Sequence, residues 1–149
     1  MRLEDEIYQK KFESVYQKLH LNLTFTNSWL REKENQLFKD FGITPQQYNV
    51  LRILRGNYPN PYSTAQIRER MLDKLSDASR IVDRLLKKGL VERKVCPADK
   101  RLVDVIVSKQ GLVLLSKMEE SIQMSSNLLK NLSAQEAALV NQFLDKIRE

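Results

Sequence analysis

Cysteine and histidine are almost absent from this chain of 149 residues, which contains only Cys96 and His20. One cysteine excludes an intrachain disulfide, and two such residues far apart in the sequence are too few for a structural metal site. Neither residue has a recognisable nucleophile–base partner, and the carboxylates show no paired pattern typical of acid–base catalysis. The sequence therefore indicates a protein that is not an enzyme and needs no metal or cofactor.

Long apolar runs are also lacking. No stretch of 18 apolar residues occurs, so no transmembrane helix is predicted. The first ten residues are charged and have no apolar segment of the kind found in a signal peptide. Together with the single cysteine, these features predict a cytoplasmic protein with no membrane partner.

Glycine and proline are scarce, with four of each. Because these two residues are frequent in turns, their scarcity favours long helices over a sheet of many strands. Hydrophobic residues make up 42% of the chain and charged residues 30%, which is typical of a folded domain and not of a disordered one. The length fits one domain, and we expect residues 1–149 to form it.

Positive charge is concentrated in the middle of the chain. The formal net charge is +6. Residues 60–110 contain twelve Lys and Arg against seven Asp and Glu, so they carry +5 of this total. This distribution predicts a polyanionic partner for the middle segment, the alternative being a basic surface that only faces solvent.

Three helix starts have the signature of a capping box, in which Ser or Thr is followed three residues later by Gln or Glu. The signature occurs at 44–47, where Pro45 occupies the first helical position, and again at 63–66 and 133–136. Ser76, before the acidic Asp77, is a simpler N-cap candidate for another helix. These signals predict helices over 44–57, 63–71, 76–88 and from 133 to the end.

An apolar pattern of helical spacing precedes the first box and predicts one long helix over 4–38. Its members are Tyr8, Phe12, Val15, Leu19, Leu23, Leu30 and Leu37. Gly42 is expected to end this segment. A helix of about 50 Å cannot cover a small domain along its whole length, so a second copy of the chain is expected to cover the rest.

Segments 90–95 and 102–107 are rich in β-branched residues and predict a β-hairpin, with the turn-rich, basic linker 96–101 at its tip. Helices resume after 108. The predicted fold class is mainly α with a small β-hairpin wing: a winged helix-turn-helix lobe over 44–107, with dimerisation helices over 4–38 and 112–148.

This order of elements points to double-stranded DNA as the partner, because the major groove admits one α-helix. Helix 76–88 has packing residues on one side and polar residues on the other, with Ser79 and Arg80 near the N-terminal end that recognition helices direct at bases. The hairpin tip is placed to reach the DNA backbone or a minor groove. The expected DNA-binding residues are Ser76, Asp77, Ser79, Arg80, Arg84, Lys87, Arg93, Lys100 and Arg101.

Segment 44–112 resembles the MarR (multiple antibiotic resistance regulator) family. The matching motifs are Thr44-Pro45-Gln46-Gln47-Tyr48, Ser79-Arg80-Ile81-Val82-Asp83-Arg84-Leu85-Leu86-Lys87-Lys88-Gly89-Leu90-Val91-Glu92-Arg93, Asp99-Lys100-Arg101 and Ser108-Lys109-Gln110-Gly111. The resemblance implies a two-fold symmetric homodimer held by the terminal helices, with 76–88 as recognition helix. It also implies that Asp99 orients Arg101, which reaches the minor groove. The chain departs from the family with Ser79 in place of the usual Thr and with charged residues at 68–70.

The resemblance further implies a small aromatic or phenolic effector, bound between the dimer arms and the DNA-binding lobe. The candidate side chains to line that cavity are Tyr16, His20, Trp29 and Tyr48, although the sequence favours ordinary core packing for each. Some relatives sense oxidants through a cysteine in the first helix. The first helix here has none, so a redox role for Cys96 is only a minor alternative.

The sequence thus predicts a sequence-specific DNA-binding transcriptional regulator, a repressor that binds a near-palindromic operator as a homodimer. Its half-sites are expected about one helical turn of DNA apart. Two alternatives stay open: a winged helix used as a protein-interaction module, and an architectural protein that binds DNA of any sequence.

Overall fold

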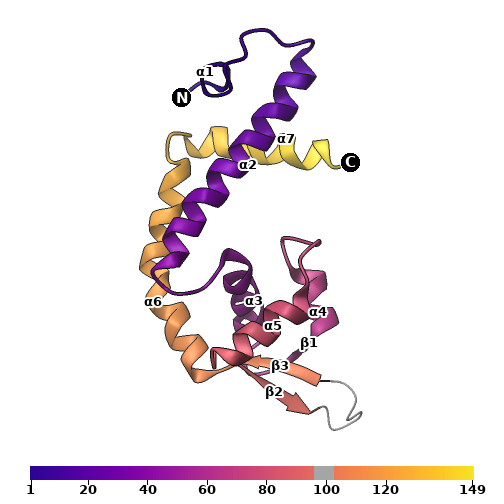
Figure 1. Ribbon diagram of the computed structural model, residues 1–149, viewed down its shortest axis with the longest axis vertical. Helices are drawn as coiled ribbons and strands as arrows, with labels where there is room; N and C mark the ends of the chain where they lie inside the picture. The colour runs from indigo at the N-terminus through magenta and orange to yellow at the C-terminus, as the bar shows by residue number, and fades with distance from the viewer. Residues whose placement is uncertain (96–102) are drawn as a thin grey trace.

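The structure, a computed structural model, describes residues 1–95 and 103–149 (Figure 1). It is mainly helical with one small antiparallel sheet, as expected. The elements in chain order are α1 (Leu3–Glu6), α2 (Val15–Lys39), α3 (Pro45–Gly56), β1 (Tyr62–Ser63), α4 (Thr64–Arg70), α5 (Ala78–Lys87), β2 (Val91–Val95), β3 (Val103–Val107), α6 (Lys109–Ser126), the 3-10 helix η1 (Asn127–Leu129) and α7 (Ala134–Ile147). Helices α3, α4 and α5 and the sheet form a lobe at one end, α2 and α6 extend from it, and α7 lies against α2 away from the lobe (Figure 1). Among the described residues, no helix is long and apolar enough to cross a membrane.

The three predicted capping boxes are confirmed. At the start of α3, the Gln47 N–H donates to Thr44 Oγ1 and the Thr44 N–H donates to Gln47 Oε1, each over 3.2 Å. The same reciprocal pairs form at Ser63 and Gln66 before α4, and at Ser133 and Glu136 before α7. These three helix starts are therefore encoded locally, by side chains that satisfy otherwise unpaired N–H groups.

The prediction of a single helix over 4–38 is wrong. Helix α1 ends at Glu6, Tyr8 adopts a left-handed φ of 54°, and α2 begins only at Val15. Ser14 caps α2 by accepting from the Gln17 N–H at 3.1 Å, while Gln17 Oε1 accepts from the Glu13 N–H at 2.8 Å. Ser14 and Gln17 have the same spacing as the other boxes, but the apolar pattern running through Tyr8 concealed this helix start.

The expected N-cap of the helix predicted over 76–88, which is α5 in the structure, is wrong by one residue. Asp77, not Ser76, is the N-cap, because its carboxylate accepts from the Arg80 N–H at 3.1 Å. The Ser76 hydroxyl instead donates to Asp73 Oδ2 at 2.8 Å. A carboxylate at this position also interacts favourably with the helix dipole.

The predicted hairpin is confirmed, and a third strand joins it. Strands β2 and β3 pair from Val91 opposite Val107 to Val95 opposite Val103. The two-residue strand β1 pairs with the other edge of β3, which gives the order β1-β3-β2. Sequence patterns did not reveal β1, since its two residues, Tyr62 and the capping residue Ser63, are too few to show an alternation.

The core of the lobe lies where α3, α4 and α5 meet the sheet and the first half of α6. Its most completely buried side chains are Val50, Leu51, Leu54, Ile67, Met71, Leu85, Val105, Leu115 and Met118. Gly111 sets the junction between α6 and the lobe, because a Cβ there would lie 2.2 Å from the Leu90 carbonyl oxygen. Ser108 reinforces the junction, donating to the Gly89 carbonyl oxygen at 2.7 Å and accepting from the Gly111 N–H at 3.0 Å.

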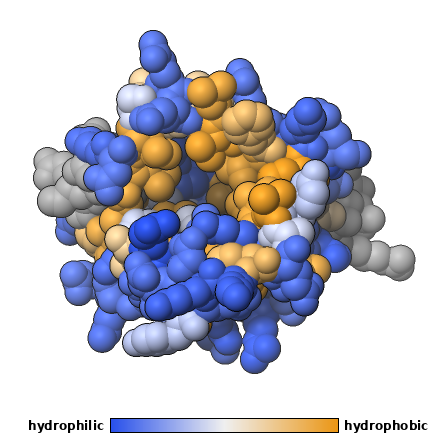
Figure 2. All heavy atoms as spheres, turned by 90° about the horizontal axis from the view of Figure 1, so that it is seen from above, coloured by the Kyte–Doolittle hydropathy of each residue, from blue (hydrophilic) through white to orange (hydrophobic). Residues whose placement is uncertain are grey.

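Helices α2 and α7 carry apolar side chains that the chain itself does not cover. Leu19, Leu23, Val140, Phe143, Leu144, Lys146 and Ile147 line a groove of about 550 Å³. Phe143 is 61% exposed, and α7 has no buried residue. Figure 2, which views the molecule from this end, shows apolar side chains gathered there. We call this surface, defined by these seven residues, the α2–α7 groove.

Candidate nucleic-acid interface

Helix α5 separates packing residues from polar residues as predicted. Ala78, Val82 and Leu85 are buried against the lobe. Because an α-helix completes a turn about every 3.6 residues, Arg80 and Lys87 lie opposite that buried face, and both are exposed. Arg80 is also in the first turn of α5, so the structure presents it at the outer, N-terminal end of the helix.

The two flanks of this exposed face are directed at different parts of the lobe. On one flank, Arg84 lines a cleft of about 250 Å³ between the start of α3 and the start of α5. On the other flank, Asp83 lies beside the hairpin, where its Oδ1 accepts from Arg93 Nη2 at 2.7 Å. Within the described residues, the side chains of Arg80 and Arg84 have no ion pair and no hydrogen bond.

Two basic residues near α5 are held by the protein. Arg93, expected to contact DNA, makes the ion pair with Asp83, and both side chains are more than half exposed. Lys88 donates to the Gly42 carbonyl oxygen and lies 3.5 Å from Gln47 Oε1, which ties the end of α5 to the start of α3. The sequence could not distinguish these cations from Arg80 and Arg84, whose side chains have no partner in the described part of the chain, because pairing depends on how β2 and α3 lie against α5.

The hairpin tip falls in the segment 96–102, which lies outside the described residues. The expected DNA contacts Lys100 and Arg101, the expected orienting residue Asp99, and Cys96 are all in this segment. Their roles stay predictions from the sequence.

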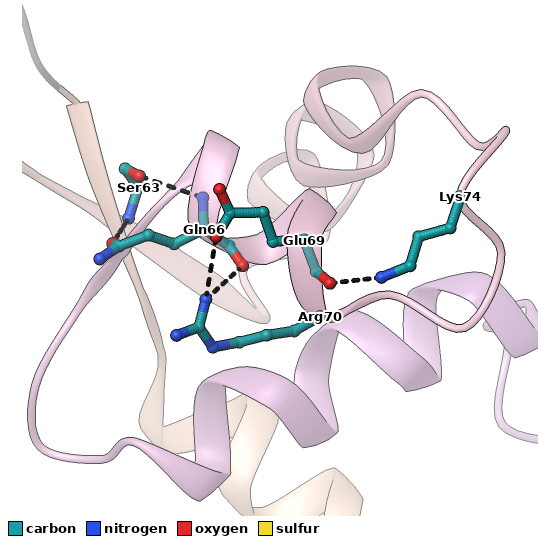
Figure 3. A network of polar contacts seen from close by, with 5 residues as sticks. All are labelled: Ser63, Gln66, Glu69, Arg70 and Lys74. Carbon is teal, nitrogen blue, oxygen red and sulfur yellow. Dashed lines mark hydrogen bonds and ion pairs between the residues drawn. The ribbon is translucent and has the colours of Figure 1, made fainter.

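The charged residues of α4 form contacts that the sequence did not predict (Figure 3). Arg70 donates to the Gln66 carbonyl oxygen at 2.9 Å and lies 3.6 Å from Glu69 Oε2. Its guanidinium also lies 4.5 Å from the centre of the Tyr62 ring, so it joins α4 to β1. Lys74 donates to the Glu69 carbonyl oxygen. Within the charged stretch at 68–70, Glu69 and Arg70 therefore hold α4 in place instead of forming part of the core.

The four residues expected to line an effector cavity are not brought together. Tyr16 is 78% exposed near the start of α2, and His20 is exposed on the same helix. Trp29 is half-buried and lines none of the described pockets. Of the four, Tyr48 alone lines one of the pockets found among the described residues, and its ring stacks on Phe38 with the centroids 4.9 Å apart.

That pocket has a volume of about 500 Å³ and lies between α2, α3, α6 and the loop after α4. We call it the Tyr48 pocket. It is lined by Asn27, Arg31, Glu34, Phe38, Pro45, Gln46, Tyr48, Asn49, Met71, Leu72, Asp73 and Ile122. Both apolar and charged side chains are present, so an aromatic molecule with polar substituents would fit its chemistry.

The loop beside the Tyr48 pocket leads directly to the N-cap of α5. Asn49 Oδ1 accepts from the Leu72 N–H at 3.0 Å, which fixes the loop to α3. The Asp73 carboxylate accepts from the Ser76 hydroxyl at 2.8 Å and from the Leu75 N–H at 3.1 Å. These bonds, that of Ser76 first, hold the pKa of Asp73 below its ordinary value. Asn49 and Asp73 thus connect the pocket to the start of α5.

The described part of the chain contains no group of three or more His, Cys, Asp or Glu residues that could hold a metal ion.

A model of the MarR family matches residues 41–102. A MarR transcription factor from Planctomyces limnophilus is 32% identical, with a TM-score of 0.70, and the match covers 91% of this chain and 98% of that one. A mutant of MarR from E. coli, solved in complex with operator DNA, is 24% identical with a TM-score of 0.72 over 91% of this chain and 99% of that one. An organohalide-sensing transcriptional regulator in its 2,4-dichlorophenol-bound form is 16% identical with a TM-score of 0.82, covering 95% of this chain and 86% of that one.

Proposed function

This chain belongs to the MarR family and is a DNA-binding transcriptional regulator rather than an enzyme. From that premise we propose that it is a repressor, which acts as a homodimer on a near-palindromic operator. The observation that carries the proposal is the exposed face of α5. It presents Arg80, Arg84 and Lys87 to solvent, with Arg80 in the first turn and both arginines unpaired within the described residues. An arginine so placed can donate two hydrogen bonds to the edge of a guanine in the major groove.

The residues proposed to contact DNA are Ser76, Asp77, Ser79, Arg80, Arg84, Lys87, Arg93, Lys100 and Arg101, with Asp99 orienting the hairpin tip. They divide by role. Arg80 and Ser79 would read bases, whereas the other cations would contact phosphates and position the helix. We place this activity in the cytoplasm, where duplex DNA is accessible in a bacterial cell.

The homodimer part of the proposal is supported by the α2–α7 groove. Side chains as large as Phe143, 61% exposed, and Ile147, 54% exposed, are costly to leave in water, and a second copy would cover them. A two-fold dimer would place two α5 helices in successive major grooves, about 34 Å apart. The operator should therefore be nearly palindromic. All of residues 1–149 would serve one domain, with the terminal helices as its dimerisation part.

An effector would act through the Tyr48 pocket. The neighbour solved with 2,4-dichlorophenol supports a small aromatic or phenolic ligand. Such a ligand can release DNA only by binding one arrangement of the lobe better than another. The bonds from Asn49 and Asp73 offer a route for this coupling, because they fix the loop that precedes the N-cap of α5.

Selection from a library of random duplexes tests the proposal. The full-length protein should enrich one near-palindromic sequence with half-sites about one helical turn apart. Binding without enrichment would favour an architectural DNA binder. Failure to retain any DNA at low salt would favour a protein-interaction module.

A further inference from the structure

The cleft between α3 and α5 contains a residue whose part in DNA binding neither the sequence motifs nor the family comparison assigns. We propose that this cleft binds a phosphate of the DNA backbone, held by the side chains of Gln46 and Arg84. The inference rests on the proposed DNA-binding function and assigns a contact from α3, outside the recognition helix and the hairpin.

The cleft has a size and position that suit a phosphate. It encloses about 250 Å³ and is lined by Thr44, Gln46, Gln47, Ser76, Asp77, Arg80, Ile81 and Arg84. It opens beside the exposed face of α5, at the end of the helix that would enter the groove. A helix in the major groove has the DNA backbone on its flanks, so a cleft on this flank faces phosphates and not base edges.

The side chains that line the cleft also differ in whether they are already engaged in hydrogen bonds or free to bind an anion. Gln47 is buried and is used by the capping box and by Lys88. The Asp77 carboxylate caps α5 by accepting from the Arg80 N–H, and it is the acidic side chain among the lining residues. Gln46 and Arg84 have no side-chain hydrogen bond or ion pair within residues 1–95 and 103–149. These two donors are therefore free to bind an anion.

The backbone of α3 adds one further donor. Pro45 has no N–H, the Gln47 N–H is bonded to Thr44 Oγ1, and the Tyr48 N–H is bonded to the Thr44 carbonyl oxygen at 2.9 Å. In the described part of the chain, the Gln46 N–H is thus the donor of this turn that has no partner. An amide side chain, a backbone N–H and a guanidinium together match the acceptor oxygens of one phosphate.

The positions of Arg84 and Arg80 on α5 distinguish phosphate binding from base reading. Arg84 lies on the flank shared with Ile81 and Lys88, and Lys88 contacts the start of α3. Arg80 borders the cleft from the position opposite the buried face, so it keeps its proposed role at the bases. The proposal therefore predicts that Gln46 and Arg84 contribute to binding of any DNA sequence, and that Arg80 contributes to discrimination.

The test uses fluorescence anisotropy with the full-length protein, on the selected operator and on a scrambled duplex, over a series of salt concentrations. Gln46→Glu replaces a donor by a negative charge of nearly the same shape. We expect it to weaken binding to both duplexes by the same factor, on the order of 10-fold or more. Arg84→Gln should reduce the slope of log affinity against log salt by about 0.9, the value of one phosphate contact.

Gln135→Glu is the matched control. Gln135 occupies the second position of α7, as Gln46 does in α3, and it is exposed on another part of the molecule. Glutamate near a helix N-terminus is favourable, so neither variant should lose stability, which thermal unfolding will check. If Gln46→Glu binds both duplexes as tightly as Gln135→Glu does, the phosphate cleft is wrong. If the wild-type protein binds neither duplex, the proposed function itself fails.

A second measurement locates the phosphate. Operators carrying one neutral methylphosphonate are titrated in turn with the wild-type protein and with Arg84→Gln. At one position in each half-site, the methylphosphonate should lower the operator affinity of the wild-type protein by several fold and that of Arg84→Gln by less. The reason is that the methylphosphonate and the substitution remove the same contact. Equal losses in both proteins at every position would overturn the assignment.

Discussion

Individual side chains of α5 have different partners because they lie on different sides of the helix. Arg80 lies opposite the buried Val82 and Leu85, Arg84 lies towards α3, and Asp83 is paired with Arg93 of the hairpin at 2.7 Å. The sequence identifies all of these residues as polar positions of a recognition helix. It does not show which cations are already paired, because pairing is decided by tertiary contacts.

Arg80→Ala tests the base-reading role at this scale. The variant should lose about 1–3 kcal/mol of operator binding, assigned to one base position, and should bind scrambled DNA nearly as well as the wild-type protein. Anisotropy titration of both duplexes measures the two losses. An equal loss for operator and scrambled DNA would show that Arg80 contacts only the backbone.

Asp73 gives a prediction for stability against pH. Its folded-state pKa is lowered by the Ser76 hydroxyl and the Leu75 N–H, so its contribution is present above the ordinary pKa of 3.8 and is lost as the pH falls through the lowered value. The stability advantage of the wild-type protein over Asp73→Asn should therefore narrow as the pH falls below about 3.8. Denaturant unfolding across this range measures it. An advantage that grows in acid would contradict the assigned hydrogen bonds.

At the scale of elements, local side-chain chemistry sets most boundaries and tertiary contacts set the rest. The capping boxes at Thr44, Ser63 and Ser133 are predictable because both partners lie within four residues. Strand β1 was not predictable, since two residues become a strand only by pairing with β3. The start of α2 at Val15, after its N-cap Ser14, was missed because an apolar pattern continued across it.

The junction between α6 and the lobe is tested by Gly111→Ala. The new Cβ would lie 2.2 Å from the Leu90 carbonyl oxygen and 2.8 Å from a Val107 methyl, so α6 must move. We expect a loss of about 1–3 kcal/mol in the free energy of unfolding, as for other overpacked sites. Gly56→Ala is the control, because nothing lies within 4 Å of its added Cβ. It should be neutral or gain about 0.5–1 kcal/mol. Equal effects of the two variants would mean that α6 is not packed as described.

At the scale of the whole molecule, the lobe and the terminal helices differ in how far their apolar side chains are buried. The lobe covers its own core, which includes the fully buried Leu51, Leu54 and Leu85. Helices α2 and α7 leave the apolar side chains of the α2–α7 groove without a cover within the described residues, and this is the strongest physical support for a second copy. The sequence predicted a second copy from the length of the helix expected over 4–38. Because α2 is shorter than that helix, this argument is weaker than it was, and the exposed α2–α7 groove is a better argument for the dimer.

Phe143→Glu tests the proposed dimer. A carboxylate in the middle of the α2–α7 groove would have to be desolvated on association, so the variant should be monomeric in light scattering while the lobe stays folded. Gln142→Glu, the neighbouring exposed position outside the groove, should stay dimeric. A dimeric Phe143→Glu protein would exclude this groove as the interface.

The central claim, sequence-specific DNA binding, is tested most directly by comparing the affinity for the selected operator with that for its scrambled version at two salt concentrations. We predict that the operator is bound at least about 10³-fold more tightly, and that both affinities fall steeply as salt increases. Equal affinity for the two duplexes, or no binding to either at low salt, would contradict the account.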